Sequence, residues 1–128
     1  MKIESKKSEF HGHGVFATEK IFSGDIIEKC PVVPIKIGEL PFLKKSAIVD
    51  YLFEWETTPF SEYKMAFILG YCMVYNHSYT PNSKTLRNFE ENTMDFIALK
   101  DIECGEEITH NYHGDPNCKE PVWFEVRS

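Results

Sequence analysis

The sequence predicts a mainly β fold with short helices. Glycine and proline interrupt the 128-residue chain at short intervals, and the runs between them are rich in Val, Ile, Phe and Tyr, which favour strands. An internal repeat, in which residues 16–27 match residues 97–108, adds a second strand-turn-strand signal. The length is close to that of one typical domain, so a single domain is expected over residues 1–128.

Three strands are predicted from local pattern. Residues 13–18 and 25–35 read as strands separated by a turn at Ser23-Gly24, and Pro31 and Pro34 are expected to end or expose the second of them. Residues 94–99 read as a third strand, in which alternate side chains point to opposite sides. Met94, Phe96 and Ala98 are expected on one side.

The repeat is the most informative of these patterns. A shift of 81 residues superimposes four identical residues from each end of the chain: Ala17 on Ala98, Ile21 on Ile102, Gly24 on Gly105, and Ile27 on Ile108. Each copy reads as a strand, a turn whose glycine can adopt positive φ, and a second strand. We expect the two copies to pair as pseudo-symmetric halves; the alternative is chance similarity between two β-turns.

The middle of the chain carries a different period. Apolar residues in 42–56 and in 65–73 recur at i, i+3 and i+4 spacing. Two short helices are predicted there.

Composition and charge limit the classes of partner. Twenty acidic against fourteen basic residues give a net charge of −6, which argues against direct binding to nucleic acid and suits a basic partner. The longest mostly apolar run, residues 65–75, is far shorter than the roughly 20 residues that cross a bilayer, so no membrane contact is expected. The sequence shows no secretion signal and its four cysteines are far apart, which predicts an intracellular protein with reduced thiols.

Three segments carry residues suited to chemistry: 11–17 (HGHGVFA), 75–82 (YNHSYTPN) and 105–112 (GEEITHNY). Each has an ordinary explanation alone, because Gly12-x-Gly14 is too short for a dinucleotide fingerprint and the other two could be simple turns. In this order and at these distances they resemble the SET-domain protein-lysine methyltransferases. The match extends over 11–35 and 65–112, more loosely over 121–126, and is most similar to the minimal single-domain SET proteins of large viruses and some bacteria.

The resemblance implies a β-clip fold of small sheets with a C-terminal pseudoknot. It implies one SET domain over 1–128, with a variable insert at about 38–62 and a C-terminal tail at about 113–128. S-adenosyl-L-methionine would bind on one face, and a lysine of a histone tail or other basic protein would enter a channel from the other. A homodimer is a further possibility that the resemblance raises.

Individual residues take roles from the resemblance. Gly12, His13 and Gly14 match the segment whose backbone lies against the cofactor, and Asn76 and His77 match the pair that contacts its amino acid and adenine portions. Tyr112 matches the catalytic tyrosine. Trp123 matches an adenine-stacking aromatic, and Tyr51 and His110 match substrate-side positions.

Structural roles compete with several of these assignments. His77 is equally consistent with a buried histidine that locks the pseudoknot. Trp123 would serve as well to close the core, and for Tyr51 helix packing is the stronger alternative. Tyr112 has the weaker alternative of a core tyrosine.

The sequence also departs from the family pattern. Tyr79 stands where many members have a zinc-binding cysteine, so no structural zinc is predicted, although the set His110, His113, Asp115 and Cys118 has ligand-type side chains. A second active-site tyrosine of some members falls at Cys30 or Thr85. The competing functions are therefore a non-catalytic SET-like module that binds a peptide or protein and, ranked well behind, a metal-binding β domain.

Overall fold

The computed structural model describes residues 2–9, 12–48, 52–56 and 58–111. They form two compact units. The first comprises Met1–Lys29, Val74–Leu86 and Asp95–Ser128, and the second comprises Cys30–Met73 and Arg87–Met94. The mainly β class is confirmed, since nine strands accompany only short helical turns in the described residues.

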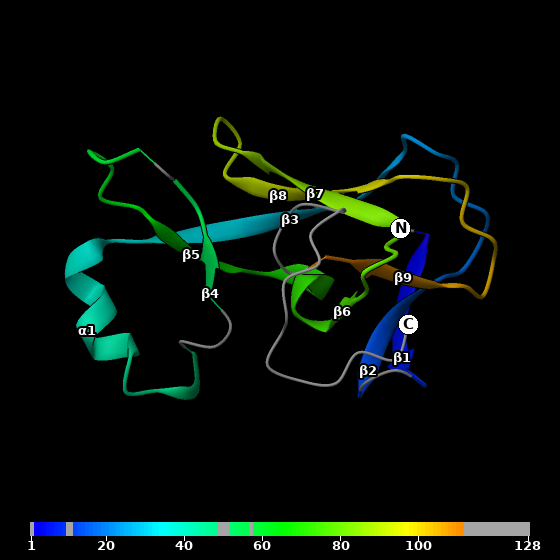
Figure 1. The fold of residues 1–128 in the computed structure, drawn as a ribbon, viewed down its shortest axis with the longest axis horizontal. Coiled ribbons are helices and arrows are strands. Elements are labelled where there is room, and N and C mark those ends of the chain that lie inside the picture. The colour runs from blue at the N-terminus through cyan, green and yellow to red at the C-terminus, as the bar shows by residue number, and fades with distance from the viewer. Residues whose placement is uncertain (1, 10–11, 49–51, 57, 112–128) are drawn as a thin grey trace. The chain divides into compact units, whose positions relative to one another are not determined.

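The first unit contains a four-stranded sheet of order β1-β2-β9-β6 (Figure 1). Strands β1 (Ile3–Lys7), β2 (His13–Ala17) and β9 (Glu107–His110) pair antiparallel in that order. The two-residue strand β6 (Asn76–His77) pairs with β9 in parallel. The predicted strand at 13–18 is thus confirmed as β2, and three distant segments meet in one sheet.

The two copies of the repeat pair with each other, as predicted. Ile21 and Ile102 form a reciprocal antiparallel bridge, with N···O distances of 2.9 and 2.7 Å. The turn glycines, Gly24 and Gly105, have φ of 89° and 90°. Each donates its N–H at 2.8 Å to the alanine of the other copy, Ala98 and Ala17 respectively.

Side chains repeat this symmetry in the turns. The Asp25 carboxylate accepts from the Phe22 N–H at 3.1 Å, and Glu106 accepts from the Glu103 N–H at 3.0 Å. Carbonyls of the opposite copy accept from the hydroxyl of Ser23 at 3.2 Å and from the thiol of Cys104 at 3.1 Å. The core of this unit lies around the two turns and includes the fully buried Ile21, Phe96, Ile102 and Ile108.

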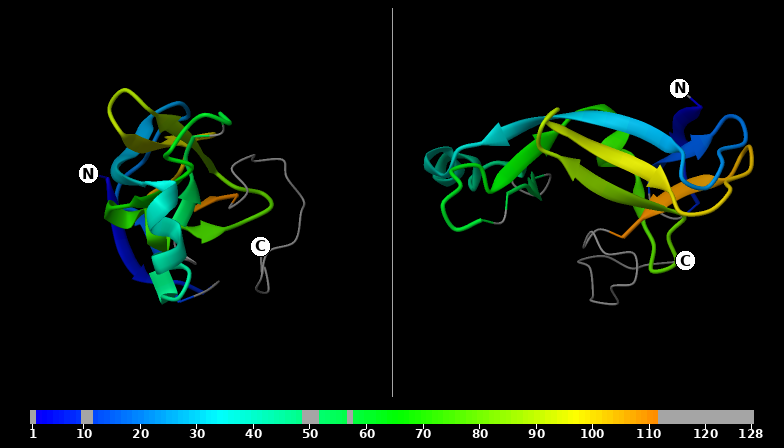
Figure 2. Two further views of the ribbon diagram at one scale, coloured as in Figure 1. Left: turned by 90° about the vertical axis from the view of Figure 1, so that its left-hand side faces the viewer. Right: turned by 90° about the horizontal axis from the view of Figure 1, so that it is seen from above.

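Three strands continue from one unit into the other: β3 (Ile26–Ile35), β7 (Ser83–Asn88) and β8 (Thr93–Ala98). Strands β7 and β8 are neighbours and run in opposite directions (Figure 2). The predicted strands at 25–35 and 94–99 are confirmed, and Met94, Phe96 and Ala98 are all buried. Pro31 is exposed but neither proline ends β3.

In the second unit β5 (Met65–Ile68) pairs antiparallel with β3 on one side and with β4 (Leu52–Glu54) on the other. Trp55 is buried there, 4.9 Å from the ring of Phe89, and its carbonyl accepts a hydrogen bond from the Arg87 guanidinium at 2.8 Å. No helix in the described part of the chain has the length and apolar character needed to cross a membrane.

The helix predicted at 65–73 is wrong, because these residues form β5 and the 3-10 turn η3 (Gly70–Val74). Within 42–56, the described residues form the end of α1 (Leu40–Leu43), a 3-10 turn at 47–48 and strand β4 in place of one continuous helix; η1 (Ile37–Glu39) precedes α1. Short apolar runs fit both periods, and pairing with β3 selects the strand. Ala66 and Ile68 are accordingly buried while Met65 and Phe67 are half-buried.

Candidate functional site

The glycine segment that the sequence predicted for the cofactor borders the first sheet. Gly12 has φ of 53° and its carbonyl accepts from the Ser8 N–H at 2.7 Å, which ties the start of β2 to the end of β1. Gly14 lies in β2, where a Cβ would be 2.9 Å from Glu107 Cδ and 3.0 Å from Asn76 Nδ2. A side chain at this position would therefore displace the Glu107 carboxylate and crowd the Asn76 amide.

Asn76 brings the second predicted segment against the first. It is buried in β6, and its Nδ2 donates to the His13 carbonyl at 3.2 Å and to Glu107 Oε2 at 2.6 Å. Its neighbour His77 is also buried and lies opposite His110 in the β6/β9 register. The structure therefore places together Gly14, His13, Asn76, His77 and His110, all from the predicted set.

Both histidines are packed among aromatic rings. The His77 ring lies 4.6 Å from Tyr79 in edge-to-face geometry, and His110 lies 5.3 Å from Phe96. Burial, together with the neighbouring His77, lowers the pKa of His110 from 6.5 to about 3, although a hydrogen bond with the Tyr75 backbone opposes the shift. His110 is therefore neutral at physiological pH and 2% exposed; its substrate contact stays a prediction.

Glu107 and Asn82, to which the sequence analysis gave no role, form hydrogen bonds within or to the third segment, residues 105–112. Glu107 accepts from Ser8 Oγ at 2.5 Å as well as from Asn76. Asn82 bonds the β9 backbone twice, donating to the Glu107 carbonyl and accepting from the Thr109 N–H, each at 2.8 Å. The repeat could have singled out Glu107, because the equivalent position in the other copy is the apolar Ile26.

The remaining predicted site residues, Tyr51, Tyr112 and Trp123, lie outside the described residues. So do three of the four ligand-type residues of the 110–118 loop. Within the ranges that the structure describes, no three His, Cys, Asp or Glu side chains gather closely enough to hold a metal ion.

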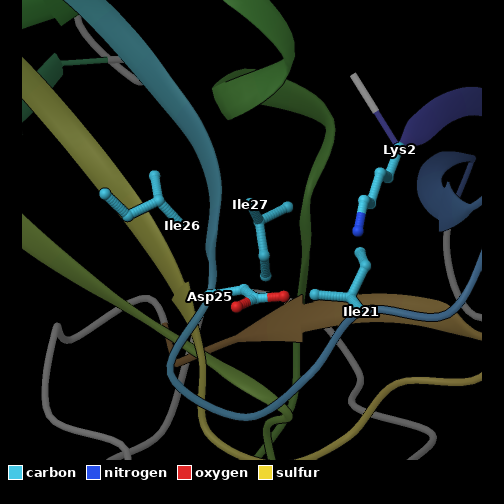
Figure 3. Close-up of a pocket in the computed structure, with 5 residues that line it drawn as sticks. All are labelled: Lys2, Ile21, Asp25, Ile26 and Ile27. Carbon is cyan, nitrogen blue, oxygen red and sulfur yellow. The ribbon is translucent and has the colours of Figure 1, made fainter.

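Two open hollows lie in the first unit. One of about 400 Å³ borders the site and is lined by Lys6, Lys7, Glu9, Phe16, Gly105 and Glu107. The other, of about 500 Å³, is lined by Lys2, Ile21, Asp25, Ile26 and Ile27 (Figure 3). None of the described residues that line the second hollow was predicted for binding.

Comparisons with known proteins agree with the geometry. The sequence profile of the SET domain matches residues 12–113. The H3 lysine-37 specific histone-lysine N-methyltransferase of Schizosaccharomyces pombe is 29% identical over 96% of this chain and 77% of its own length. The H3 lysine-4 specific enzyme of Aspergillus oryzae is 32% identical over 86% of this chain, which spans only 9% of that protein.

A solved structure shows the same fold. The crystal structure of a Plasmodium falciparum protein, described as a candidate histone methyltransferase, superimposes with a TM-score of 0.67 at 35% identity. It covers 87% of this chain and 96% of that one. These relationships support protein-lysine methylation, for which SET enzymes use S-adenosyl-L-methionine, and do not favour the non-catalytic module.

Proposed function

Because the chain belongs to the SET-domain family, we propose that it transfers a methyl group from S-adenosyl-L-methionine to a lysine of a histone tail or another basic protein. One observation carries this proposal. The Gly12–Gly14 segment, the Asn76-His77 pair and strand β9, separate in the sequence, meet in one sheet. Strand β9 then leads through the buried Asn111 to Tyr112.

The chemistry of the described residues supports a cofactor site. A Cβ at Gly12 would meet no atom within 4 Å, whereas Gly14 packs against Glu107 and the buried amide of Asn76, and His13 and His77 adjoin them. The two glycines, the two histidines and Asn76 would hold the cofactor, with Trp123 against its adenine. When bound it supplies an activated methyl group on a sulfonium.

The chain's own contribution is to place the lysine and keep it neutral. Displacement at a methyl group requires an amine lone pair aligned with the breaking bond, so positioning dominates. An apolar channel disfavours the ammonium form and lowers the pKa of the substrate lysine. Tyr112 would orient the amine and stabilise the developing charge through its hydroxyl, with Tyr51 and His110 on the substrate side.

The net charge of −6 favours a basic substrate. The two fungal relatives are named for different lysines of histone H3. A histone tail is therefore the first substrate to test, with other lysine-rich proteins next.

The direct test is transfer of labelled methyl from S-adenosyl-L-methionine to histones and lysine-rich peptides. Tyr112→Phe is compared with wild type and with Tyr63→Phe, a half-buried tyrosine of the second unit. We expect labelled lysine with wild type and Tyr63→Phe, and a loss of about 100-fold or more in Tyr112→Phe, the size of one lost transition-state hydrogen bond. Transfer at full rate in Tyr112→Phe would contradict the role of Tyr112, and a wild type that labels no lysine would contradict the function.

A further inference from the structure

We infer that Glu107 is the positioning residue of the cofactor site, acting through Ser8 and Asn76 rather than by touching the cofactor. This inference rests on the proposed function. Both carboxylate oxygens are engaged: Oε1 accepts from Ser8 Oγ at 2.5 Å, and Oε2 accepts from Asn76 Nδ2 at 2.6 Å. A single side chain on β9 thus anchors segments that lie 99 and 31 residues away.

The Ser8 arm fixes the glycine segment at Gly12. Ser8 follows β1 directly, and its backbone N–H donates to the Gly12 carbonyl at 2.7 Å. Its hydroxyl meanwhile points to Glu107. Ser8, and through it Gly12, is therefore attached to β9 by one carboxylate oxygen.

The Asn76 arm fixes the orientation of an amide. Both Asn76 hydrogen bonds leave Nδ2, one to the His13 carbonyl and one to Glu107. A carboxylate only accepts hydrogen bonds, so it would repel Asn76 Oδ1 if the amide were flipped. Glu107 therefore holds the Asn76 amide with Nδ2 toward the carboxylate. Oδ1 is left to face any cofactor that Asn76 contacts.

The contact with Gly14 adds a steric element. The Glu107 carboxylate lies so close beneath Gly14 that no Cβ fits between them. The side chain therefore also packs against the β2 backbone at Gly14. Gly14, His13 and Asn76, three of the predicted cofactor residues, each contact Glu107 or a group bonded to it.

The repeat separates this role from a purely structural one. Ile26 occupies the position equivalent to Glu107 in the other copy and is 57% exposed. The same turn and the same backbone hydrogen bonds form there without a carboxylate at this position. The turn itself therefore does not require Glu107.

The test compares Glu107→Ala, Glu107→Gln and, as a matched control in the same hairpin, the exposed Glu103→Gln. Binding of S-adenosylhomocysteine is measured by calorimetry, the Asn76 side-chain NH₂ signals by ¹⁵N NMR, and folding by thermal midpoint. Gln keeps one acceptor oxygen for Asn76 but loses the charge, which makes its hydrogen bond weaker. We expect Glu107→Ala to raise the Kd at least tenfold, Glu107→Gln to restore part of that loss, and Glu103→Gln to leave the Kd unchanged.

Two readouts keep this inference distinct from the proposed function. The Asn76 NH₂ signals report the anchor without any cofactor, and we expect both Glu107 variants to shift them. Wild-type Kd values in a folded Glu107→Ala, or unmoved Asn76 signals, would overturn the inference alone. A folded wild-type protein that binds no S-adenosylhomocysteine would overturn the proposed function and the cofactor role of Glu107 with it.

Discussion

The two copies of the repeat share their backbone geometry and differ in what they present. Both turns have a glycine at φ near 90°, an acidic side chain that accepts from the turn backbone, and a reciprocal bridge between Ile21 and Ile102. One copy then carries Glu107, bonded to two distant segments, and the other carries the exposed Ile26. The same backbone hydrogen bonds therefore accompany a candidate site residue, Glu107, in one copy and an exposed side chain, Ile26, in the other.

The copies diverge further along their second strands. Three residues beyond Glu107, the C-terminal copy has the buried His110. The equivalent residue of the N-terminal copy, three beyond Ile26, is the exposed Lys29. The first copy continues through β3 into the second unit, while the second continues to Asn111. The difference teaches that the candidate site residues lie beyond the turn, whose own residues are used in the pairing of the two copies.

The largest effect is expected from truncation at the centre of the symmetry. Ile21→Ala and Ile102→Ala each remove a side chain at most 1% exposed, so each should lower the free energy of unfolding by about 2–5 kcal/mol. Chemical denaturation measures both losses. Nearly equal losses would support a shared core; a large loss for one and almost none for the other would break the equivalence of the copies.

Acid should act on the C-terminal copy through His110. Its pKa is about 3 in the folded protein and 6.5 ordinarily, so the unfolded chain binds a proton between these values and the folded protein does not. Stability therefore rises with pH over this window and is lost as pH falls from 6.5 toward 3, by up to about 1.4 kcal/mol per pH unit.

Denaturation at a series of pH values tests this slope. His110→Asn should remove that component, whereas Lys29→Gln at the equivalent position of the other copy should keep it. An unchanged slope in a folded His110→Asn would show that His110 does not carry the acid sensitivity.

A smaller, paired effect is expected at the turn glycines. A Cβ at Gly24 or Gly105 meets no atom within 4 Å, so Gly24→Ala and Gly105→Ala test backbone strain alone. Positive φ should cost each variant about 1–2 kcal/mol. Thermal unfolding of the two variants should give the same decrease; no decrease in either would mean that the turns relax to another conformation.

The smallest effect is expected at Ile26, the exposed residue equivalent to Glu107. Ile26→Gln replaces an exposed apolar side chain, so the free energy of unfolding should change by no more than about 0.5 kcal/mol and methyl transfer should persist. Glu107→Gln, the same residue type at the equivalent position, serves as the comparison. Loss of transfer in Ile26→Gln would show that the N-terminal copy also contributes to the site.

The parts of the fold that sequence predicted are those with a strict local signal. The repeat contained paired glycines and isoleucines, so both the turns and their pairing followed from it. The 65–73 run failed as a helix because Met65 and Ile68 satisfy the helical spacing while their strand neighbours decide the structure. Local periodicity contains no information about a strand that pairs from elsewhere in the chain.

The site divides in the same way. The motifs containing Gly14 and Asn76 identified the segments that meet, because those residue types are restricted by close packing and hydrogen bonding. Glu106 and Glu107 are adjacent acidic residues, and only the comparison with Asp25 and Ile26 in the other copy distinguishes them in the sequence. Only the three-dimensional pairing shows that one caps its own turn while the other reaches Ser8 and Asn76.

The bridge between Ile21 and Ile102 also has a consequence for the kinetics of folding. Its two residues are separated by most of the chain, and the turns on either side depend on the same long-range closure. Closing so large a loop costs entropy before any hydrogen bond compensates, and chains rich in such contacts fold slowly. On the ribosome, neither turn can find its partner until residue 105 has emerged, so Asn76 and the glycine segment stay unassembled until that point of synthesis.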